Sequence, residues 1–278
     1  MSRRPLIIAV CALVAAGVIV TAGVTQFAEP TAPATKAAPA PAVTRPRAPA
    51  PLAAPAPHGL PVIDYWSPPR GFSDDPRPQS TTGITEGLQP TTALVLYDAP
   101  GGKPKARLRP SISGLPVTVP IVARRTGWFA VLVPSVNRKI GWLPEGGWTP
   151  LPLHDHLVVQ RGAHQLTWLR DGVAKGSWQV ATGTSRTPTP LGRTFVLGRT
   201  ATRGAVYAGL DALALGSVPD DPGVMSASLS QAHTGFHAWS NRSVFGRSIS
   251  NGCIRLPRAA QRVLLANIAP GTPVTVLD

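Results

Sequence analysis

A cysteine and a histidine near the C-terminus of this 278-residue chain have the types and spacing needed for nucleophilic chemistry. Cys253 lies in the segment S-N-G-C-I-R-L, residues 250–256, and follows His237 by 16 residues. The attacking species is the thiolate, so such a cysteine needs an imidazole or a positive charge that lowers its pKa from about 8.5. His237 and Arg255 could supply both. This combination predicts a cysteine nucleophile with a histidine base.

Two short strands and a turn are expected to position these groups. Residues 234–239 alternate loosely like a strand, and residues 253–256 favour a second strand after a loop rich in glycine, serine and asparagine. Adjacent strands would bring the imidazole and the thiol together. Gly252 permits a tight turn, so the amide N–H groups of residues 252 and 253 could converge on a developing oxyanion, an interaction worth roughly 3 kcal/mol.

Less specific interpretations of the same residues compete with this one. A lone cysteine is usually a small buried hydrophobe, and a lone histidine is usually a surface or capping residue. His233 is a rival base, because residues four apart on one strand share a face with each other. Spacing alone does not choose between His233 and His237.

The remaining histidines do not suggest a metal site. His154, His156 and His164 have one nearby acid, Asp155, and no second cysteine, which is a poor set of zinc ligands. We expect a solvated cluster there, and we expect the reaction to need no metal or cofactor.

The motif G-F-H-A-W…G-R-S-I-S-N-G-C-I-R-L, residues 235–256, resembles the active-site signature of the L,D-transpeptidase (YkuD) family. The resemblance extends over residues 154–278. Residues 180–195, V-A-T-G-T-S-R-T-P-T-P-L-G-R-T-F, resemble the family's glycine turn, and residues 257–268 are typical of a helix opened by proline, with Ala260, Val263, Leu264 and Ile268 on one face.

This resemblance implies roles for individual residues. Cys253 would be the nucleophile, His237 the base, and the backbone carbonyl of Ala238 the group that orients the imidazole. The remaining expected site residues are Gly252 and Asn251, as support for the oxyanion, and Arg255 and Ser250, as substrate-binding residues. Asn251 stands where the family usually has histidine, so a titrating group is missing there, and Ala238 stands where glycine or serine is usual.

The implied reaction is acyl transfer on peptidoglycan stem peptides. The Cys253 thiolate would displace D-Ala four from residue three, a diamino acid, and the side-chain amine of a neighbouring stem would resolve the thioester into a 3-3 crosslink. A carbapenem should also acylate Cys253 by this resemblance. Two alternatives stay open: an L,D-carboxypeptidase, in which water resolves the thioester, and a catalytically inactive protein that binds the cell wall.

The N-terminus predicts export. Residues 1–28 place Arg3 and Arg4 before an uncharged apolar stretch, residues 6–24, which is typical of a signal peptide or a membrane anchor. Cys11 lies inside this stretch, so the exported part has one cysteine and cannot form an intramolecular disulfide. Residues 29–58 are rich in alanine and proline, the composition of an extended linker. We therefore expect an extracytoplasmic protein of the cell envelope, anchored in the membrane or secreted into the wall.

The predicted fold is mainly β, with two domains and few short helices. Residues 59–90 form a lead-in segment of uncertain structure. In residues 91–150, short β-rich runs alternate with turns, and G-W-F-A-V…G-W-L-P, residues 127–144, resembles bacterial SH3-like domains. We expect a small SH3-like β-barrel there, followed by the β-rich catalytic domain at 154–278.

The net charge of +14 indicates an anionic environment. Nucleic acid is the usual partner of such a charge, but the basic residues are scattered rather than clustered, and an exported chain rarely meets DNA. Anionic wall polymers or lipid headgroups therefore fit better than nucleic acid.

Overall fold

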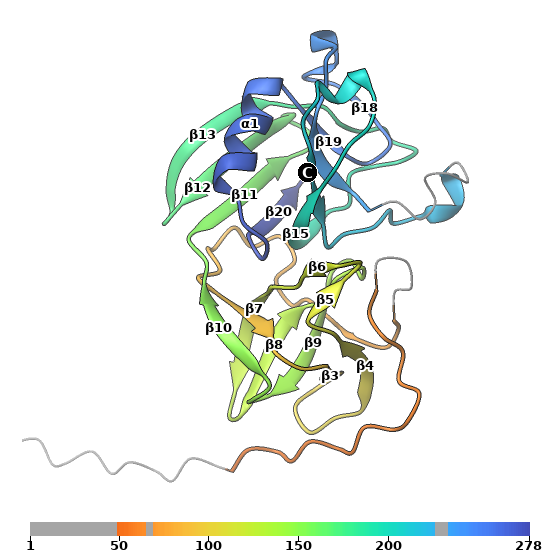
Figure 1. Cartoon of the computed structure of the whole chain (residues 1–278), viewed down its shortest axis with the longest axis vertical. Coiled ribbons are helices and arrows are strands. Elements are labelled where there is room, and N and C mark those ends of the chain that lie inside the picture. The colour runs from red at the N-terminus through yellow and green to blue at the C-terminus, as the bar shows by residue number, and fades with distance from the viewer. Residues whose placement is uncertain (1–48, 65–68, 226–232) are drawn as a thin grey trace, which may run out of the picture. The chain divides into compact units, whose positions relative to one another are not determined.

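The computed structural model describes residues 49–64, 69–225 and 233–278, and its regular secondary structure is almost entirely strands (Figure 1). The described residues belong to one compact unit. The predicted signal or anchor segment, Cys11 and most of the predicted linker lie outside the described residues. Within the described part of the chain, no helix is long and apolar enough to cross a membrane.

The first sheet lies in the N-terminal half of the described chain. Its strand order is β10-β2-β7-β8-β9-β3-β4, and β1 pairs with β9 off this path. The strands are β1 (Ser73–Asp74), β2 (Glu86–Pro90), β3 (Leu94–Tyr97), β4 (Pro104–Leu108), β7 (Val119–Arg125), β8 (Trp128–Leu132), β9 (Lys139–Pro144) and β10 (Trp148–Pro152). A separate hairpin joins β5 (Ser111–Ile112) and β6 (Leu115–Pro116).

Alternation of apolar residues explains the core of this sheet. Leu94, Leu96, Trp128 and Ala130 point to one buried side, as the two-residue period of a strand requires. Both β1 and β2 lie before residue 91, and the sheet ends with β10 at residue 152. Parts of the lead-in segment are therefore strands. The assignment of this sheet as SH3-like stays a prediction.

The described end of the predicted linker touches this sheet. The indole N–H of Trp128 donates to the carbonyl of Pro51 at 2.8 Å, and the Tyr97 hydroxyl donates to the carbonyl of Ala54 at 2.8 Å. The expectation that residues up to 58 act only as a spacer is wrong at this end, because two buried aromatic side chains need polar partners and find them in that backbone.

The second sheet occupies the C-terminal half, with the order β13-β12-β11-β20-β15-β16-β17-β19. Its strands are β11 (Asp155–Gln160), β12 (Gln165–Arg170), β13 (Val173–Gln179), β15 (Gly192–Thr200), β16 (Ala212–Leu215), β17 (Gly235–Ala238), β19 (Ile254–Leu256) and β20 (Pro273–Leu277). A small parallel sheet pairs β14 (Thr182–Gly183) with β18 (Ser248–Ser250). The 3-10 turns are η1 (Ala205–Tyr207), η2 (Pro222–Val224) and η3 (Arg242–Val244). The mainly β prediction is confirmed.

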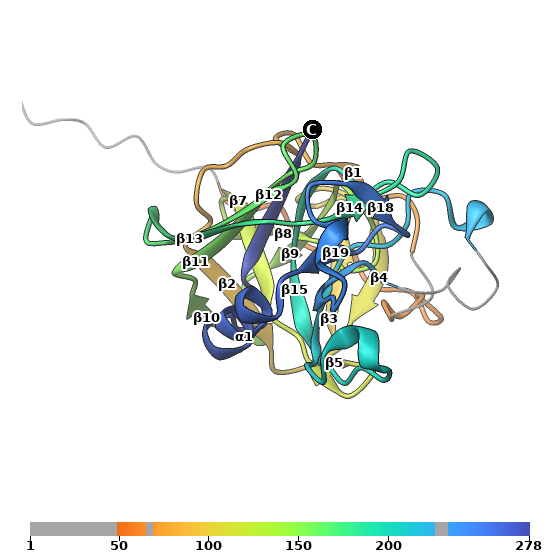
Figure 2. The same ribbon diagram turned by 90° about the horizontal axis from the view of Figure 1, so that it is seen from above.

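The single α-helix of the described residues is α1 (Arg258–Asn267), labelled in Figures 1 and 2. It packs on β16 and β17. The predicted helix at 257–268 is confirmed, with Pro257 as its N-cap. Ala260 and Leu264 are buried as expected, but Val263 is exposed and Gln261 is buried instead. The Gln261 amide donates to the carbonyls of Asp211 and Phe236 at 2.7 and 3.3 Å, so this polar residue anchors the helix to the strand that carries His237.

The two sheets share buried contacts. Phe195 and Leu197 of β15 belong to the hydrophobic core of the first sheet. Arg193, also on β15, makes a bidentate ion pair with Asp75, and its Nε lies 2.8 Å from Oδ2. Both side chains are almost fully buried, so removing either would leave an uncompensated charge in the interior.

Candidate active site

The predicted nucleophile and base lie on neighbouring strands. β17 and β19 are parallel partners, with His237 opposite Arg255, and Cys253 immediately precedes β19. The expectation that two adjoining strands carry these residues is confirmed. Both Cys253 and His237 line one cavity of about 210 Å³, together with Tyr207, Pro219, Met225, His233, Thr234, Trp239, Ser250, Asn251 and Arg255.

His237 is held as a neutral imidazole. Its Nδ1 lies 2.9 Å from the carbonyl oxygen of Ala238. A carbonyl only accepts, so Nδ1 carries the proton and Nε2 keeps its lone pair. Burial, opposed by this hydrogen bond and reinforced by the charge of Arg255, lowers the pKa of His237 to about 4. The ring of Tyr207 packs edge-on against the imidazole at 5.0 Å. The interaction predicted for the Ala238 carbonyl is therefore present.

The pKa of the Cys253 thiol is shifted in the direction opposite to the one expected. Burial raises the pKa of its thiol, against the lowering effects of a backbone hydrogen bond from Gly235 and of the Arg255 charge. Desolvation therefore outweighs the favourable charge, so the expected lowering of the thiol pKa is not found.

The turn before the nucleophile uses its polar groups internally. Gly252 has φ 102°, a conformation that favours glycine, and its N–H donates to Ser250 Oγ at 3.2 Å. The Ser250 hydroxyl in turn donates to the carbonyl of Cys253. The Gly252 amide and the Ser250 hydroxyl are thus bonded within the turn, and the roles expected of them towards an oxyanion and a substrate stay predictions.

Two threonines that received no role in the sequence analysis hold this turn from the other side. Thr189 Oγ1 donates to the carbonyl of Gly252 at 2.9 Å and accepts the Gly183 N–H at 3.0 Å. Thr187 Oγ1 donates to the carbonyl of Ser250 at 3.1 Å. A Cβ at Gly183 would lie 2.2 Å from the carbonyl oxygen of Thr187, so glycine is required there. The segment T-P-T-P-L-G, residues 187–192, was the sequence signal that could have identified these two threonines.

Arg255 lies across the indole of Trp239, with its guanidinium carbon 3.7 Å from the ring centroid. Its Nε is buried without a hydrogen-bond partner among the described residues, and burial lowers its pKa. Stacking on the indole face stabilises the guanidinium cation there. Asn251 is exposed at the cavity. The sequence analysis quoted Trp239 in the motif but assigned it no function.

Comparison with known proteins identifies the C-terminal half. Residues 154–276 match the model of the L,D-transpeptidase catalytic domain, YkuD. The chain is 29% identical over 128 residues to the Bacillus subtilis (strain 168) protein YkuD, named as an L,D-transpeptidase, a match that covers 46% of this chain and 68% of the relative. Residues 154–276 are a YkuD-family L,D-transpeptidase catalytic domain.

Solved structures similar to this chain carry related names. An L,D-transpeptidase from Mycobacterium smegmatis is 14% identical, with a TM-score of 0.40, over 76% of this chain and 100% of its own. The catalytic domain of the E. faecium L,D-transpeptidase is 21% identical, with a TM-score of 0.32, over 44% of this chain and 96% of its own.

His233, the rival base of the L,D-transpeptidase domain, has both ring nitrogens engaged. Nδ1 lies 2.6 Å from the carbonyl of Leu215, and Nε2 lies 3.3 Å from Ser135 Oγ. The Ser135 hydroxyl also donates to the carbonyl of Asp64 at 2.7 Å. Both ring nitrogens of His233 therefore have partners other than Cys253, so the geometry favours His237 as the base.

The other histidines of the L,D-transpeptidase domain lie apart from one another. The Nδ1 atom of His154 lies 2.8 Å from Asp171 Oδ1, and His164 Nε2 lies 2.9 Å from Ser248 Oγ. His156 is buried, so the expected solvated cluster is wrong for this residue. Among the described residues, no group of three or more acidic, cysteine or histidine side chains could hold a metal ion.

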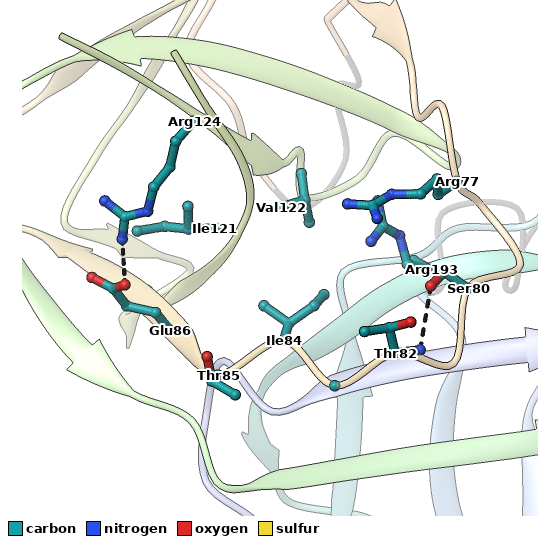
Figure 3. Close-up of a pocket in the computed structure, with 11 residues that line it drawn as sticks. Arg77, Ser80, Thr82, Ile84, Thr85, Glu86, Ile121, Val122, Arg124 and Arg193 are labelled. Atoms are coloured by element: carbon teal, nitrogen blue, oxygen red, sulfur yellow. Dashed lines mark hydrogen bonds and ion pairs between the residues drawn. The ribbon is translucent and has the colours of Figure 1, made fainter. Parts of the chain in front are cut away.

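A second cavity, of about 170 Å³, lies away from Cys253 and contains three arginines (Figure 3). Arg124 pairs with Glu86, and Arg193 with Asp75. Of the three arginines, only Arg77 has no carboxylate partner among the ion pairs of the described residues. The cavity contains neither the thiol nor the imidazole, so we place the chemistry of the L,D-transpeptidase domain at Cys253.

Proposed function

We propose that this protein is a cysteine-dependent L,D-transpeptidase that acts on peptidoglycan stem peptides, with Cys253 as nucleophile and His237 as general base. The observation that carries the proposal is the neutral imidazole beside the thiol. Its Nδ1–H is held by the Ala238 carbonyl, which leaves Nε2 to accept a proton in the cavity that Cys253 also lines.

Acylation begins with proton transfer from the Cys253 thiol to His237 Nε2. The thiolate attacks the carbonyl carbon of stem residue three, the C–N bond to D-Ala four breaks, and the departing amine takes the proton from His237. Free D-Ala and a thioester on Cys253 result. The charge of Arg255 favours the thiolate during this step, since it lowers the pKa of the thiol.

Deacylation forms the crosslink. The side-chain amine of a diamino acid on a neighbouring stem attacks the thioester, His237 accepts the amine proton, and the sulfur leaves to recover a proton. The product is a 3-3 crosslink. We assign the amide of Cys253 to the oxyanion, since that of Gly252 is used by Ser250. Arg255 and Asn251 face the substrate from the cavity lining.

The protein works outside the cytoplasm in this proposal. Positive charge followed by an uncharged apolar stretch at residues 6–24 supports export, and the alanine- and proline-rich segment beyond it supports a tether. The net charge of +14 suits a wall that contains anionic polymers.

The test is intact-mass spectrometry of the full-length protein with a carbapenem and with a tetrapeptide stem. We expect one covalent adduct with either reagent in the wild type and none in Cys253→Ala, and we expect His237→Ala to lose the adducts while remaining folded. With an acceptor stem, product analysis should show the 3-3 dimer. An adduct that persists in Cys253→Ala would overturn the mechanism, and tripeptide as the sole product would replace the transpeptidase by a carboxypeptidase.

A further inference from the structure

A turn of the N-terminal sheet contacts the segment that contributes Pro219 to the active-site cavity of the L,D-transpeptidase domain. Residues 133–138 connect β8 to β9, and Ser135 and Arg138 have φ values of 64° and 58°. Left-handed backbone at two residues other than glycine is strained, and such strain persists only where surrounding contacts stabilise it. Those contacts include residues 216–220, the segment that follows β16.

Asn137 holds this segment through the backbone of one residue. Its Nδ2 donates to the Val218 carbonyl at 2.6 Å, and its Oδ1 accepts the Val218 N–H at 3.1 Å. The side-chain amide therefore satisfies both backbone groups of Val218, as a paired strand would. The Ser135 N–H adds a bond to the carbonyl of Gly216 at 2.8 Å.

Asp220 accepts further hydrogen bonds from the same turn. Its Oδ1 accepts from Asn137 Nδ2 at 2.9 Å and from Arg138 Nη2 at 2.7 Å. Arg138 Nη1 also donates to the carbonyl of Leu191 at 3.2 Å. The Arg138 and Asp220 side chains are 40% and 34% exposed, so their ion pair is weak by itself, and the bonds from Asn137 to backbone contribute more.

Pro219 lies between the two residues held in this way, and it lines the cavity that contains Cys253 and His237. We propose that Asn137, supported by Asp220, is a positioning residue of the transpeptidase: it fixes Pro219 and so sets the shape of the wall that meets the substrate. The N-terminal sheet is then a structural part of the active site, whatever else it binds. This inference rests on the proposed function and adds to it a residue that shapes the substrate-binding wall.

The experiment compares Asn137→Ala with Lys139→Ala in the full-length protein. Lys139 is the matched control, because it lies two residues away and its ion pair, at 2.7 Å, joins Asp74 of the same sheet. We expect Asn137→Ala to speed amide hydrogen exchange in residues 216–225 about tenfold and to raise KM for a tetrapeptide donor by a similar factor. We expect kcat and the rate of Cys253 alkylation by iodoacetamide to stay within about twofold, because the thiol and its base are untouched.

Asp220→Ala is a second variant, in the catalytic domain. We expect it to speed hydrogen exchange and to raise KM in the same direction as Asn137→Ala, but by a smaller factor. The proposal is overturned if Asn137→Ala and Lys139→Ala have equal exchange and equal KM. It is also overturned if Asn137→Ala slows alkylation and lowers the melting temperature in parallel with its loss of activity, since that pattern indicates general destabilisation. A wild type that forms no product would refute the proposed function, and the exchange rates of the two variants would still decide whether Asn137 holds this segment.

Discussion

His156 makes stability depend on pH in a way that can be calculated. The residue is 5% exposed on β11, and its Nε2 lies 2.9 Å from Thr275 Oγ1. Its Nδ1 is buried and has no hydrogen-bond partner in the part of the chain that the structure describes. Burial, followed by the charge of Arg193, lowers its pKa to about 4. An unfolded histidine has a pKa of about 6.5. Below that value the unfolded chain binds a proton that the native state refuses, so acid favours unfolding.

The magnitude follows from this difference. Between pH 7.5 and pH 5.0, a histidine with native pKa near 4 and unfolded pKa near 6.5 costs about 2 kcal/mol of unfolding free energy. His237, whose pKa is also lowered to about 4, contributes a similar amount, so the wild type should lose about 4 kcal/mol from the two together. This stability is complete above about pH 6.5 and is lost as pH falls towards 4.

The perturbation is His156→Gln, which keeps an amide donor for Thr275 and removes the titrating group. Urea unfolding at pH 7.5 and 5.0 should show that the variant loses about 2 kcal/mol less than the wild type between these two pH values. His58→Gln, at an exposed position, is the control and should keep the full wild-type difference. If His156→Gln also keeps the full difference, the argument that burial excludes the proton from His156 is refuted.

Three further changes address the site itself. Arg255→Met removes the charge that lowers the pKa of Cys253, so the pH midpoint of alkylation by iodoacetamide should rise. Arg255→Lys keeps the charge and should leave the midpoint near the wild-type value. Equal midpoints for Arg255→Met and the wild type would contradict this role of Arg255. Thr189→Val leaves the buried Gly183 N–H and Gly252 carbonyl without their partner, and urea unfolding should show a loss of about 2–4 kcal/mol. Thr189→Ser keeps both bonds, and equal stability of the Val and Ser variants would disprove the bracing. Gly252→Ala has room for its Cβ, with the nearest atom at 3.6 Å, but φ is 102°, so we expect a strain of about 1–3 kcal/mol, a lower melting temperature and slower carbapenem acylation. An unchanged melting temperature and acylation rate would show that the turn does not need glycine.

Much of the fold and of the site could be predicted because the signals are local. The helix after Pro257 and the strands that carry His237 and Cys253 follow from proline placement and alternation over a few residues. The bond from His237 to the Ala238 carbonyl joins neighbours in the chain. The extent of the first sheet was harder to predict, because β2 lies in a proline-rich segment and is stabilised by pairing with β7 and the distant β10.

Residue types and short spacings were enough to predict the nucleophile and base candidates, the mainly β class and the charge of the protein. The raised pKa of the Cys253 thiol depends instead on the three-dimensional packing, because it follows from how much water distant segments exclude. The same packing pairs the Gly252 amide with Ser250 and brings Asn137, 116 residues before Cys253, to the backbone of Val218 beside the cavity-lining Pro219. A polar group takes whichever partner the fold brings within about 3 Å, and spacing along the chain does not specify that partner.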